Sequence, residues 1–261
     1  MQIAREIGYP VAVKPRLSMD SSGVSVDLVD DGAVREAFRH AASCSDGGVI
    51  VESFVSGREY RATVVAGKTV AVVERQRPFI VGDGAQTVAA LIAQENTNPR
   101  RGTHKFNPLK SIEIDDQRTL LHRSGLSSDA IPAPGEIVVL KPTGHISAGG
   151  AAIDRSDDIH PDTVDLLRQV TRVLDIDVAG IDFVVDGPIS ESIWDAGGAI
   201  VEVNSGPGYW IHEYPSEGSP RDIGVPIVDM LFPPGRRCVC RSSPSPGPPS
   251  RRQSSTRSRR S

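Results

Sequence analysis

The sequence predicts an α/β fold, on three observations. A strand–helix–strand pattern spans residues 10–55, a β-hairpin pattern follows at 60–75, and two β-branched apolar runs stand at 180–185 and 199–204. Short β-branched runs are typical of strands, whereas apolar residues that recur every three to four positions are typical of amphipathic helices. Both patterns occur along the chain, so we expect helices packed on antiparallel or mixed sheets.

Local signals place the individual elements. Asp30-Asp31 caps a helix over 32–43, Gly8 ends a short first helix, and Ala66-Gly67-Lys68 is the turn of the hairpin. The apolar stripe of the helix over 32–43 consists of Val34, Ala37, Phe38 and Ala41. In chain order we expect strands at 10–15, 25–29, 49–55, 60–65, 69–75, 136–140, 180–185 and 199–204, and helices at 3–8, 32–43, 87–95, 117–124 and 162–174.

Composition limits the class of protein. With 261 residues, of which 38% are hydrophobic and 24% charged, the chain fits one large or two small globular domains. No apolar run is long enough to span a membrane, and the first residues lack the pattern of a signal peptide. The odd set of cysteines, Cys44, Cys238 and Cys240, argues against a disulfide framework, so we expect a cytoplasmic protein.

The end of the chain differs from the rest. Residues 236–261 contain eight arginines and no acidic residue, so the net charge of −4 divides into +8 here and −12 in the rest of the chain. This Arg/Ser/Pro-rich tail is expected to be disordered, and the alternative is that it is out-of-frame sequence. The acidic body argues against nucleic acid as the main partner, and we expect no membrane partner.

Two strand patterns carry oxygen ligands. Glu202 and Asn204 are two residues apart in one strand and therefore point to the same side. The turn over 186–198 would let the strands at 180–185 and 199–204 pair as a hairpin, and Asp182 then joins them as a neighbour. Carboxylate and amide oxygens suit a hard cation such as Mg²⁺. The alternative is that these are ordinary strands with polar residues on a wet face. The order Gly-Ile-Asp, then Val-Glu-Val-Asn, then Ser205-Gly206-Pro207-Gly208 resembles the metal-binding end of the ATP-grasp ligases.

The first strand supports the same resemblance. Gly-Tyr-Pro-Val-Ala-Val-Lys-Pro at 8–15 resembles the start of an ATP-grasp small lobe, and the resemblance implies that Lys14 contacts the ATP phosphates. It also implies that the loop with Gly23 covers the phosphates, although the family loop is richer in glycine. By the same resemblance, Glu52 to Val55 line the adenine pocket and Glu59 accepts hydrogen bonds from the ribose. Without the resemblance, Lys14 is an edge-strand lysine facing water and Glu59 a surface charge.

Further motifs resemble the ATP-grasp module of the cyanophycin synthetase family. They are Gly82-Asp83-Gly84, Asn98-Pro99-Arg100-Arg101-Gly102, the run from Gly149-Gly150 to His160-Pro161, and Asp229 to Gly235. The resemblance covers about residues 3–235. It implies an ATP-grasp domain over 1–235, with a small lobe at about 9–52, a large lobe at about 53–235 and an ATP cleft between them. Because nothing precedes the end of the first helix, we expect an N-terminally truncated domain.

The resemblance also implies a reaction. Mg·ATP phosphorylates a carboxylate at the end of a polyaspartate chain, and an amine attacks the acyl phosphate. The result is aspartate addition to the backbone of cyanophycin, a polymer of aspartate and arginine. Asp182, Glu202 and Asn204 would hold Mg²⁺, and Arg155 would add positive charge as a catalytic residue. The alternative for Arg155 is an ion pair with Asp157 or Asp158.

Two other functions stay open. One is another ATP-grasp carboxylate–amine ligase, similar to glutathione synthetase. The other is a nucleotide-binding remnant without catalysis, because the phosphate loop is rich in serine and a second ligase domain is missing. We therefore expect weak activity or none from this fragment alone. An uncovered apolar face would favour self-association, so a homo-oligomer is included among the partners.

Overall fold

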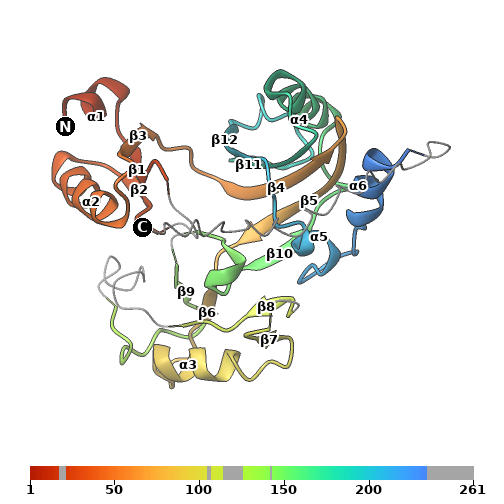
Figure 1. Cartoon of the computed structure of the whole chain (residues 1–261). Coiled ribbons are helices and arrows are strands. Elements are labelled where there is room, and N and C mark those ends of the chain that lie inside the picture. Colours follow the sequence, from red (N-terminus) through yellow and green to blue (C-terminus); the bar gives the residue numbers. More distant parts are fainter. Residues whose placement is uncertain (18–21, 105–106, 114–125, 142, 234–261) are drawn as a thin grey trace, which may run out of the picture.

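A computed structural model describes residues 1–17, 22–104, 107–113, 126–141 and 143–233. It confirms the predicted α/β fold, with two main antiparallel sheets and two small strand pairs. Figure 1 shows three parts: the N-terminal sheet with its helices, the large sheet under α4, and a smaller part around α3. The predicted tail at 236–261 and the predicted helix at 117–124 lie outside the described residues. None of the described helices is long and apolar enough to cross a membrane.

The N-terminal part is a three-stranded sheet in the order β2-β1-β3, built from β1 (Val11–Pro15), β2 (Ser25–Leu28) and β3 (Val49–Ser53). Helix α1 (Gln2–Ile7) precedes it, and α2 (Asp31–Cys44) packs on one face. The Asp30 side chain accepts a hydrogen bond from the backbone N–H of Ala33, which caps α2 as the sequence predicts. In Figure 1, α2 lies on the outer side of this sheet, away from the large sheet.

The prediction of the apolar stripe on α2 is wrong for one residue, Phe38. Val34, Ala37 and Ala41 are buried against β1, but Phe38 is 45% exposed. Position 38 lies at the margin of the stripe, and the narrow three-stranded sheet covers only the central residues. Helical spacing alone therefore overestimates the width of the buried face.

The large sheet has five antiparallel strands in the order β10-β5-β4-β11-β12. Its strands are β4 (Arg58–Val65), β5 (Lys68–Gln76), β10 (Ala151–Asp154), β11 (Val178–Val185) and β12 (Ala199–Asn204). Both predicted hairpins are present, as the β4–β5 and β11–β12 pairs. The sheet is formed by segments far apart in the sequence, because β11 inserts beside β4 rather than beside β10.

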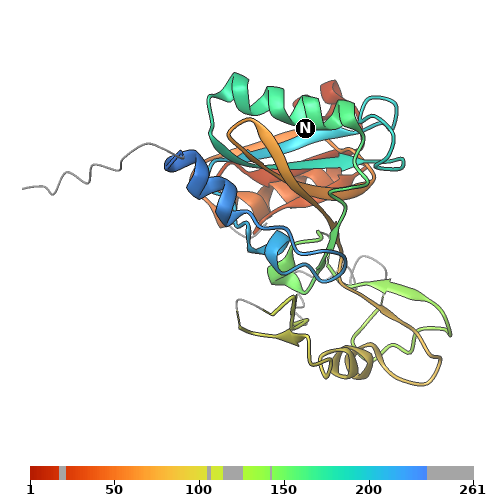
Figure 2. The same cartoon turned by 90° about the vertical axis from the view of Figure 1, so that its right-hand side faces the viewer.

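Each face of the large sheet has its own covering helices. Helix α4 (Pro161–Leu174) lies across one face, where Leu167 packs with Tyr60, Ile181 and Phe183 (Figure 2). The Tyr60 and Phe183 rings stack with their centroids 5.2 Å apart. Helices α5 (Trp210–Glu213) and α6 (Gly224–Leu231) pack on the other face at one end. The remaining part of that second face carries the candidate site.

The third part is an excursion between β5 and β10. It holds α3 (Val88–Glu95), the pair β6 (Phe79–Val81) with β9 (Ile137–Val139), the parallel pair β7 (Arg101–Gly102) with β8 (Leu109–Lys110), and the 3-10 turn η1 (Ile146–Ala148). It has a hydrophobic cluster of its own around Ile80, Leu91 and Leu140. From the sequence these residues are expected within the large lobe at about 53–235, and no separate part is predicted for them.

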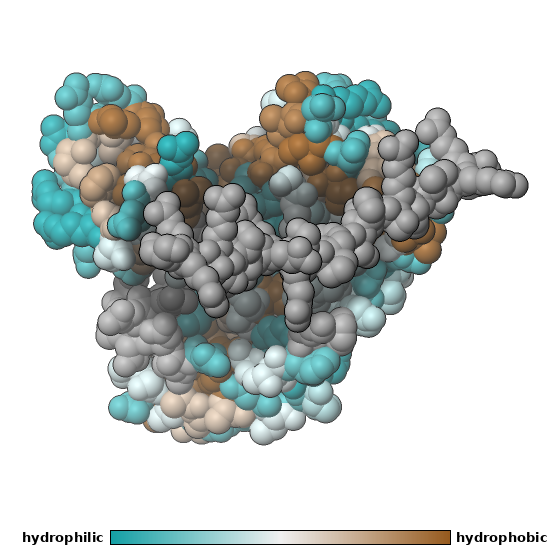
Figure 3. Space-filling view, viewed as in Figure 1, coloured by the Kyte–Doolittle hydropathy of each residue, from teal (hydrophilic) through white to brown (hydrophobic). Residues whose placement is uncertain are grey.

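Hydrophobic residues also reach the surface. Exposed apolar side chains occur on the N-terminal part, at Ile3 and Phe38, and on α6, at Val225 and Val228. Figure 3 shows hydrophobic residues on the surface of the two upper parts of the molecule, between hydrophilic ones.

Candidate functional site

Strand alternation gathers charged side chains on one face of the large sheet. Asp182 in β11 is paired with Arg61 in β4 on one side and with Glu202 in β12 on the other. Residues directly opposite each other in neighbouring strands project from the same face. Arg75 in β5 and Asn204 in β12 share this face, because Arg75 lies two residues from the partner of Arg61 and Asn204 lies two residues from Glu202.

Asp182 is held by two arginines. Arg61 donates from Nε to Oδ1 at 2.5 Å and from Nη2 to Oδ2 at 2.6 Å, which is a bidentate pair. Arg75 Nη1 lies 3.2 Å from Oδ1. All three side chains are largely removed from water. Two guanidinium groups thus meet the Asp182 carboxylate, and the carboxylates of Glu59 and Glu202 lie near enough to act on Arg75.

The guanidinium of Arg75 is buried, which is unfavourable for a charged group. Burial lowers the pKa of Arg75, and the neighbouring Asp182 charge acts in the opposite direction. Its Nε is buried and has no hydrogen-bond partner among the described residues. A buried donor without a partner is expensive unless a ligand uses it. The site can therefore accept a further anionic group.

Glu202 and Asn204 complete the oxygen donors of this face. Glu202 is exposed and Asn204 half-buried, so both can reach a ligand above the sheet. No group of three His, Cys, Asp or Glu side chains in the described part of the chain is arranged as a metal site. The set of two carboxylates and one amide still fits a hard cation in chemistry, provided that Asp182 shares its oxygens between the arginines and the metal.

The N-terminal sheet brings two predicted nucleotide-binding residues together. Lys14 Nζ lies 2.7 Å from Glu52 Oε1, and both side chains are partly exposed. Both stand on the face of this sheet opposite α2, because Glu52 is paired with Ala12, two residues before Lys14. Val55 is half-buried in the segment that leads from β3 to β4.

Gly23 has a packing role. A Cβ at this position, where φ is +77°, would lie 2.8 Å from Pro15 Cγ and 3.1 Å from Cys44. Its tight packing accounts for glycine here whether or not the loop meets a phosphate. Residues 18–21 of the same loop lie outside the described residues.

Glu59 joins the large sheet to the excursion. Its Oε2 accepts a hydrogen bond from the backbone N–H of Gly144 at 3.0 Å, and Arg77 Nη2 approaches its Oε1 at 3.4 Å. Glu59 is paired with Arg75 across β4 and β5, so it lies beside the arginine cluster. The ribose role of Glu59 stays a prediction.

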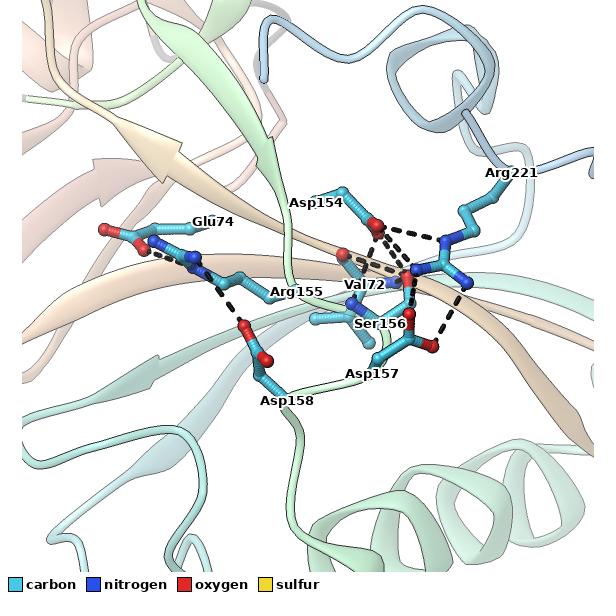
Figure 4. Close-up of polar contacts among 8 residues, drawn as sticks. All are labelled: Val72, Glu74, Asp154, Arg155, Ser156, Asp157, Asp158 and Arg221. Atoms are coloured by element: carbon cyan, nitrogen blue, oxygen red, sulfur yellow. Dashed lines mark hydrogen bonds and ion pairs between the residues drawn. The ribbon is translucent and has the colours of Figure 1, made fainter. Parts of the chain in front are cut away.

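The structure does not bring Arg155 to this site. Its Nε lies 3.0 Å from Glu74 Oε2 and its Nη1 3.6 Å from Asp158, as Figure 4 shows. Glu74 is paired with Tyr60, whose side chain packs in the core on the α4 face. Arg155 therefore lies on the opposite face of the sheet from Asp182. The alternative named from the sequence, an ion pair with Asp158, is present, and the catalytic role receives no support from this geometry.

Several known proteins are similar to this chain in sequence or in fold. No family model matches the chain. Cyanophycin synthetase from Crocosphaera subtropica is 40% identical over 229 residues, which are 87% of this chain and 26% of that protein. A glutathione biosynthesis bifunctional protein from Mannheimia succiniciproducens is 33% identical over 237 residues, 87% of this chain and 30% of that protein. The crystal structure of a bifunctional glutathione synthetase from Pasteurella multocida superimposes with a TM-score of 0.57 and 30% identity, covering 85% of this chain and 30% of that one.

The chain is similar to cyanophycin synthetases over most of its length. This similarity confirms the resemblance stated from the motifs. ATP-grasp ligases use ATP and a divalent metal ion to join a carboxylate to an amine. The chain spans about a quarter of the length of the cyanophycin synthetases it matches.

Two residues of the site, Arg61 and Arg75, are not among those expected from the sequence. A signal is present: Arg61 lies inside the predicted strand 60–65, and Arg75 ends the predicted strand 69–75. An arginine inside a buried strand needs a partner, and the partner was Asp182, more than a hundred residues away.

Proposed function

We propose that the chain is an ATP- and Mg²⁺-dependent carboxylate–amine ligase module, and that its reaction is aspartate addition to the backbone of cyanophycin. The observation that carries the proposal is the cluster of Arg61, Arg75 and Asp182 beside Glu202 and Asn204. It combines two guanidinium groups with oxygen donors on one sheet face. Phosphoryl transfer to a carboxylate needs both.

The oxygen donors would hold the metal. Asp182, Glu202 and Asn204 are the residues that would bind Mg²⁺, and the ion would offset the negative charge of the phosphate groups. Arg61 holds Asp182 in one orientation through its bidentate contact, so this carboxylate is pre-oriented. A fixed orientation reduces the reorganisation needed when the charge of the reacting groups changes.

The nucleotide would bind between the two main sheets, within the proposed limits of a small lobe at about 9–52 and a large lobe at about 53–235. Lys14 would meet the phosphates, and Gly23 would lie in the loop that covers them. Glu52 and Val55 would line the adenine pocket and Glu59 would bind the ribose. The Lys14–Glu52 ion pair keeps the lysine on the face opposite α2. When ATP binds, Lys14 would exchange its contact with Glu52 for phosphate oxygens. The Glu52 carboxylate would then be free to contact the adenine base.

The reaction then has two steps. A carboxylate oxygen of the acceptor attacks the γ-phosphorus of ATP, the bond to the β–γ bridging oxygen breaks, and ADP leaves. The amine of aspartate attacks the carbonyl carbon of the acyl phosphate, the carbon–oxygen bond to phosphate breaks, and the amine loses a proton. Arg61 and Arg75 stabilise negative charge on the transferring group in both steps, because they are already in place and largely dehydrated.

The similarity to cyanophycin synthetases supports aspartate and cyanophycin as substrates. A second candidate is a ligase similar to glutathione synthetase, which the match to the Pasteurella multocida structure favours. The third is a remnant that binds nucleotide without turnover. An assay of phosphate release separates the three. Release would require aspartate with a cyanophycin primer in the first case, γ-glutamylcysteine with glycine in the second, and would be absent with either pair in the third.

The first test is a thermal melt with and without Mg·ATP. A ligand at about 100 times its dissociation constant stabilises the folded state by about 2.7 kcal/mol. We expect the melting temperature of the parent to rise by several degrees and that of Glu202→Ala to stay almost unchanged. Glu36→Ala, on the exposed side of α2, is the matched control and should behave as the parent. Equal shifts in Glu202→Ala and the parent would remove Glu202 from the metal site.

A further inference from the structure

A second hollow lies where the excursion meets the large sheet. We call it the joint pocket. It has a volume of about 410 Å³ and is lined by the end of β5 and the segment into β6, by α3, by residues 98–101 and by Ser216-Glu217. Figure 1 shows these elements around the junction of β10 with β6, β7 and β8. This volume is in the range of small-molecule sites, which run from about 300 to 1,000 Å³.

The fold builds this pocket with its own contacts. Arg101 is only 8% exposed in its side chain and pairs with Glu95 at 3.0 Å. It also donates to the backbone oxygens of Lys110 and Gly149 at 2.8 and 3.1 Å, so it ties α3 and β8 to the start of β10. Arg101 and Glu95 are thus structural and neutralise each other. The Asn-Pro-Arg-Arg-Gly motif at 98–102 places this arginine, and its neighbour Arg100, in the pocket wall.

Two arginines and one glutamate are left to face a ligand. Arg100 uses one N–H of its guanidinium for the backbone oxygen of Ser216, and a guanidinium has five. Arg77 contacts Glu59 Oε1 through Nε and Nη2, both at 3.4 Å, and its guanidinium has further N–H groups for a ligand. Glu217 is exposed, and its backbone is fixed to β10 by the hydrogen bond from Asp154 N to Glu217 O at 2.9 Å. Phe79, Leu91 and Leu109 supply an apolar wall.

This set matches an amino acid with two carboxylates. Each carboxylate can be bound by one arginine, since guanidinium groups bind carboxylates in a fork geometry. Glu217 can bind the ammonium group. The first 235 residues of the chain carry a net charge of −12, so two arginines in one pocket wall are unusual here. This favours a role of Arg100 and Arg77 in binding an anion over a general surface charge.

We propose that the joint pocket binds the free aspartate that supplies the attacking amine. This rests on the proposed function, because it assigns a place to the amine substrate of that reaction. Arg77 in the pocket wall contacts Glu59, and Glu59 is paired with Arg75, so the pocket borders the arginine cluster. Arg100 and Arg77 bind the two carboxylates, and Glu217 orients the ammonium group.

The test measures binding of three ligands by calorimetry, with the full chain and a non-hydrolysable Mg·ATP analogue present. The ligands are aspartate, asparagine with one carboxylate fewer, and succinate without the ammonium group. We expect the parent to prefer aspartate over both. Arg100→Gln should weaken aspartate at least tenfold. Glu217→Gln should weaken aspartate but leave succinate unchanged. Arg172→Gln, an exposed arginine of α4, is the control and should bind as the parent.

Each outcome decides between the proposals. If aspartate binds Arg100→Gln and Glu217→Gln as tightly as the parent, or does not bind the parent, the assignment of the joint pocket is wrong. A normal Mg·ATP shift in the thermal melt would in that case leave the proposed function standing. Conversely, loss of aspartate binding in Arg100→Gln without any Mg·ATP shift in the parent would keep the pocket and overturn the ligase function. A melting curve of each variant shows whether it is folded. If Arg100→Gln does not fold, aspartate binding by Glu217→Gln decides the assignment of the joint pocket.

Discussion

At the scale of single residues, the site depends on how buried charges are paired. Removing one partner from a buried ion pair is costly because it leaves an uncompensated charge. Arg61 and Arg75 are buried beside Asp182, and together they exceed its charge. The face is therefore stable with Asp182 present and still able to bind an anion, which is the state that a phosphoryl-transfer site needs before its substrate arrives.

His212 is a further buried ionisable group on this face. It is 1% exposed, and its Nε2 lies 2.8 Å from Thr63 Oγ1, two residues along β4 from Arg61. Burial, together with the Arg61 charge, lowers the pKa of His212 from 6.5 to about 3. The imidazole is therefore neutral in the folded chain at neutral pH and has to be charged when the chain unfolds in acid.

This predicts a pH dependence of stability. Below pH 6.5 the unfolded chain takes up a proton that the folded His212 does not accept until about pH 3, so stability is complete above 6.5 and falls as the pH decreases. Between pH 7.5 and 5.5 the loss is about 1.4 kcal/mol. We expect the melting temperature of His212→Gln to fall less than that of the parent between pH 7.5 and 5.5. His40→Gln, an exposed control on α2, should show the same fall as the parent. An unchanged pH dependence in His212→Gln would show that another group is responsible.

At the scale of elements, β11 shows why a glycine precedes Asp182. A Cβ at Gly180 would lie 2.6 Å from Arg61 Nη1 and 2.6 Å from Pro207 Cβ. The guanidinium of Arg61 thus occupies the space of the missing side chain. We expect Gly180→Ala to displace Arg61 from Asp182, so that the chain stays folded but Mg·ATP no longer raises its melting temperature. Gly206→Ala, whose Cβ would meet no atom within 4 Å, should bind Mg·ATP as the parent does. Retained Mg·ATP binding in Gly180→Ala would mean that Arg61 is not needed at its present place.

Helix α4 stabilises the sheet from the other face. Leu167 is fully buried among Tyr60, Ile181 and Phe183, whereas Val173 on the same helix is 83% exposed. Truncation of a buried leucine costs about 2–5 kcal/mol, and a change at an exposed site costs about 0.5 kcal/mol or less. Urea unfolding of Leu167→Ala and Val173→Ala should show this difference. Similar midpoints for the two variants would contradict the assigned core.

Sequence reasoning succeeded at the elements and was weaker at the site. The two hairpins of the large sheet were predicted because period-two patterns and short turns are local signals. The order of the strands was not predicted, because β11 lies beside β4 through contacts between residues more than a hundred positions apart. For the same reason Arg61 was missed, since only the sheet order reveals its partner Asp182. The resemblance implied a catalytic role for Arg155, but the alternation that continues from β10 directs this side chain to the α4 face.

At the scale of the whole molecule, one short segment joins the two main sheets. Residues 54–57 lead from β3 to β4, and Gly57 is the last of them. Its φ is +134°, and a Cβ there would lie 2.4 Å from the backbone oxygen of Val185, at the end of β11. The segment is therefore pressed against the backbone of the large sheet, and a glycine is required both by the dihedral angle and by the space.

We expect Gly57→Ala to change how the two sheets face each other. The added methyl group collides with backbone atoms, which cannot rotate away as a side chain can, so the segment has to move. Each sheet keeps its own hydrophobic cluster and should stay folded, as circular dichroism would show. If ATP binds between the sheets, the melting-temperature shift with Mg·ATP should fall sharply. Gly48→Ala is the matched control, because its φ of +93° is equally unfavourable for alanine but no atom lies within 4 Å of the new methyl group. The two variants share the backbone penalty, so a difference in Mg·ATP binding between them reports the position of the sheets. The same Mg·ATP shift in both variants would place the nucleotide on one sheet alone.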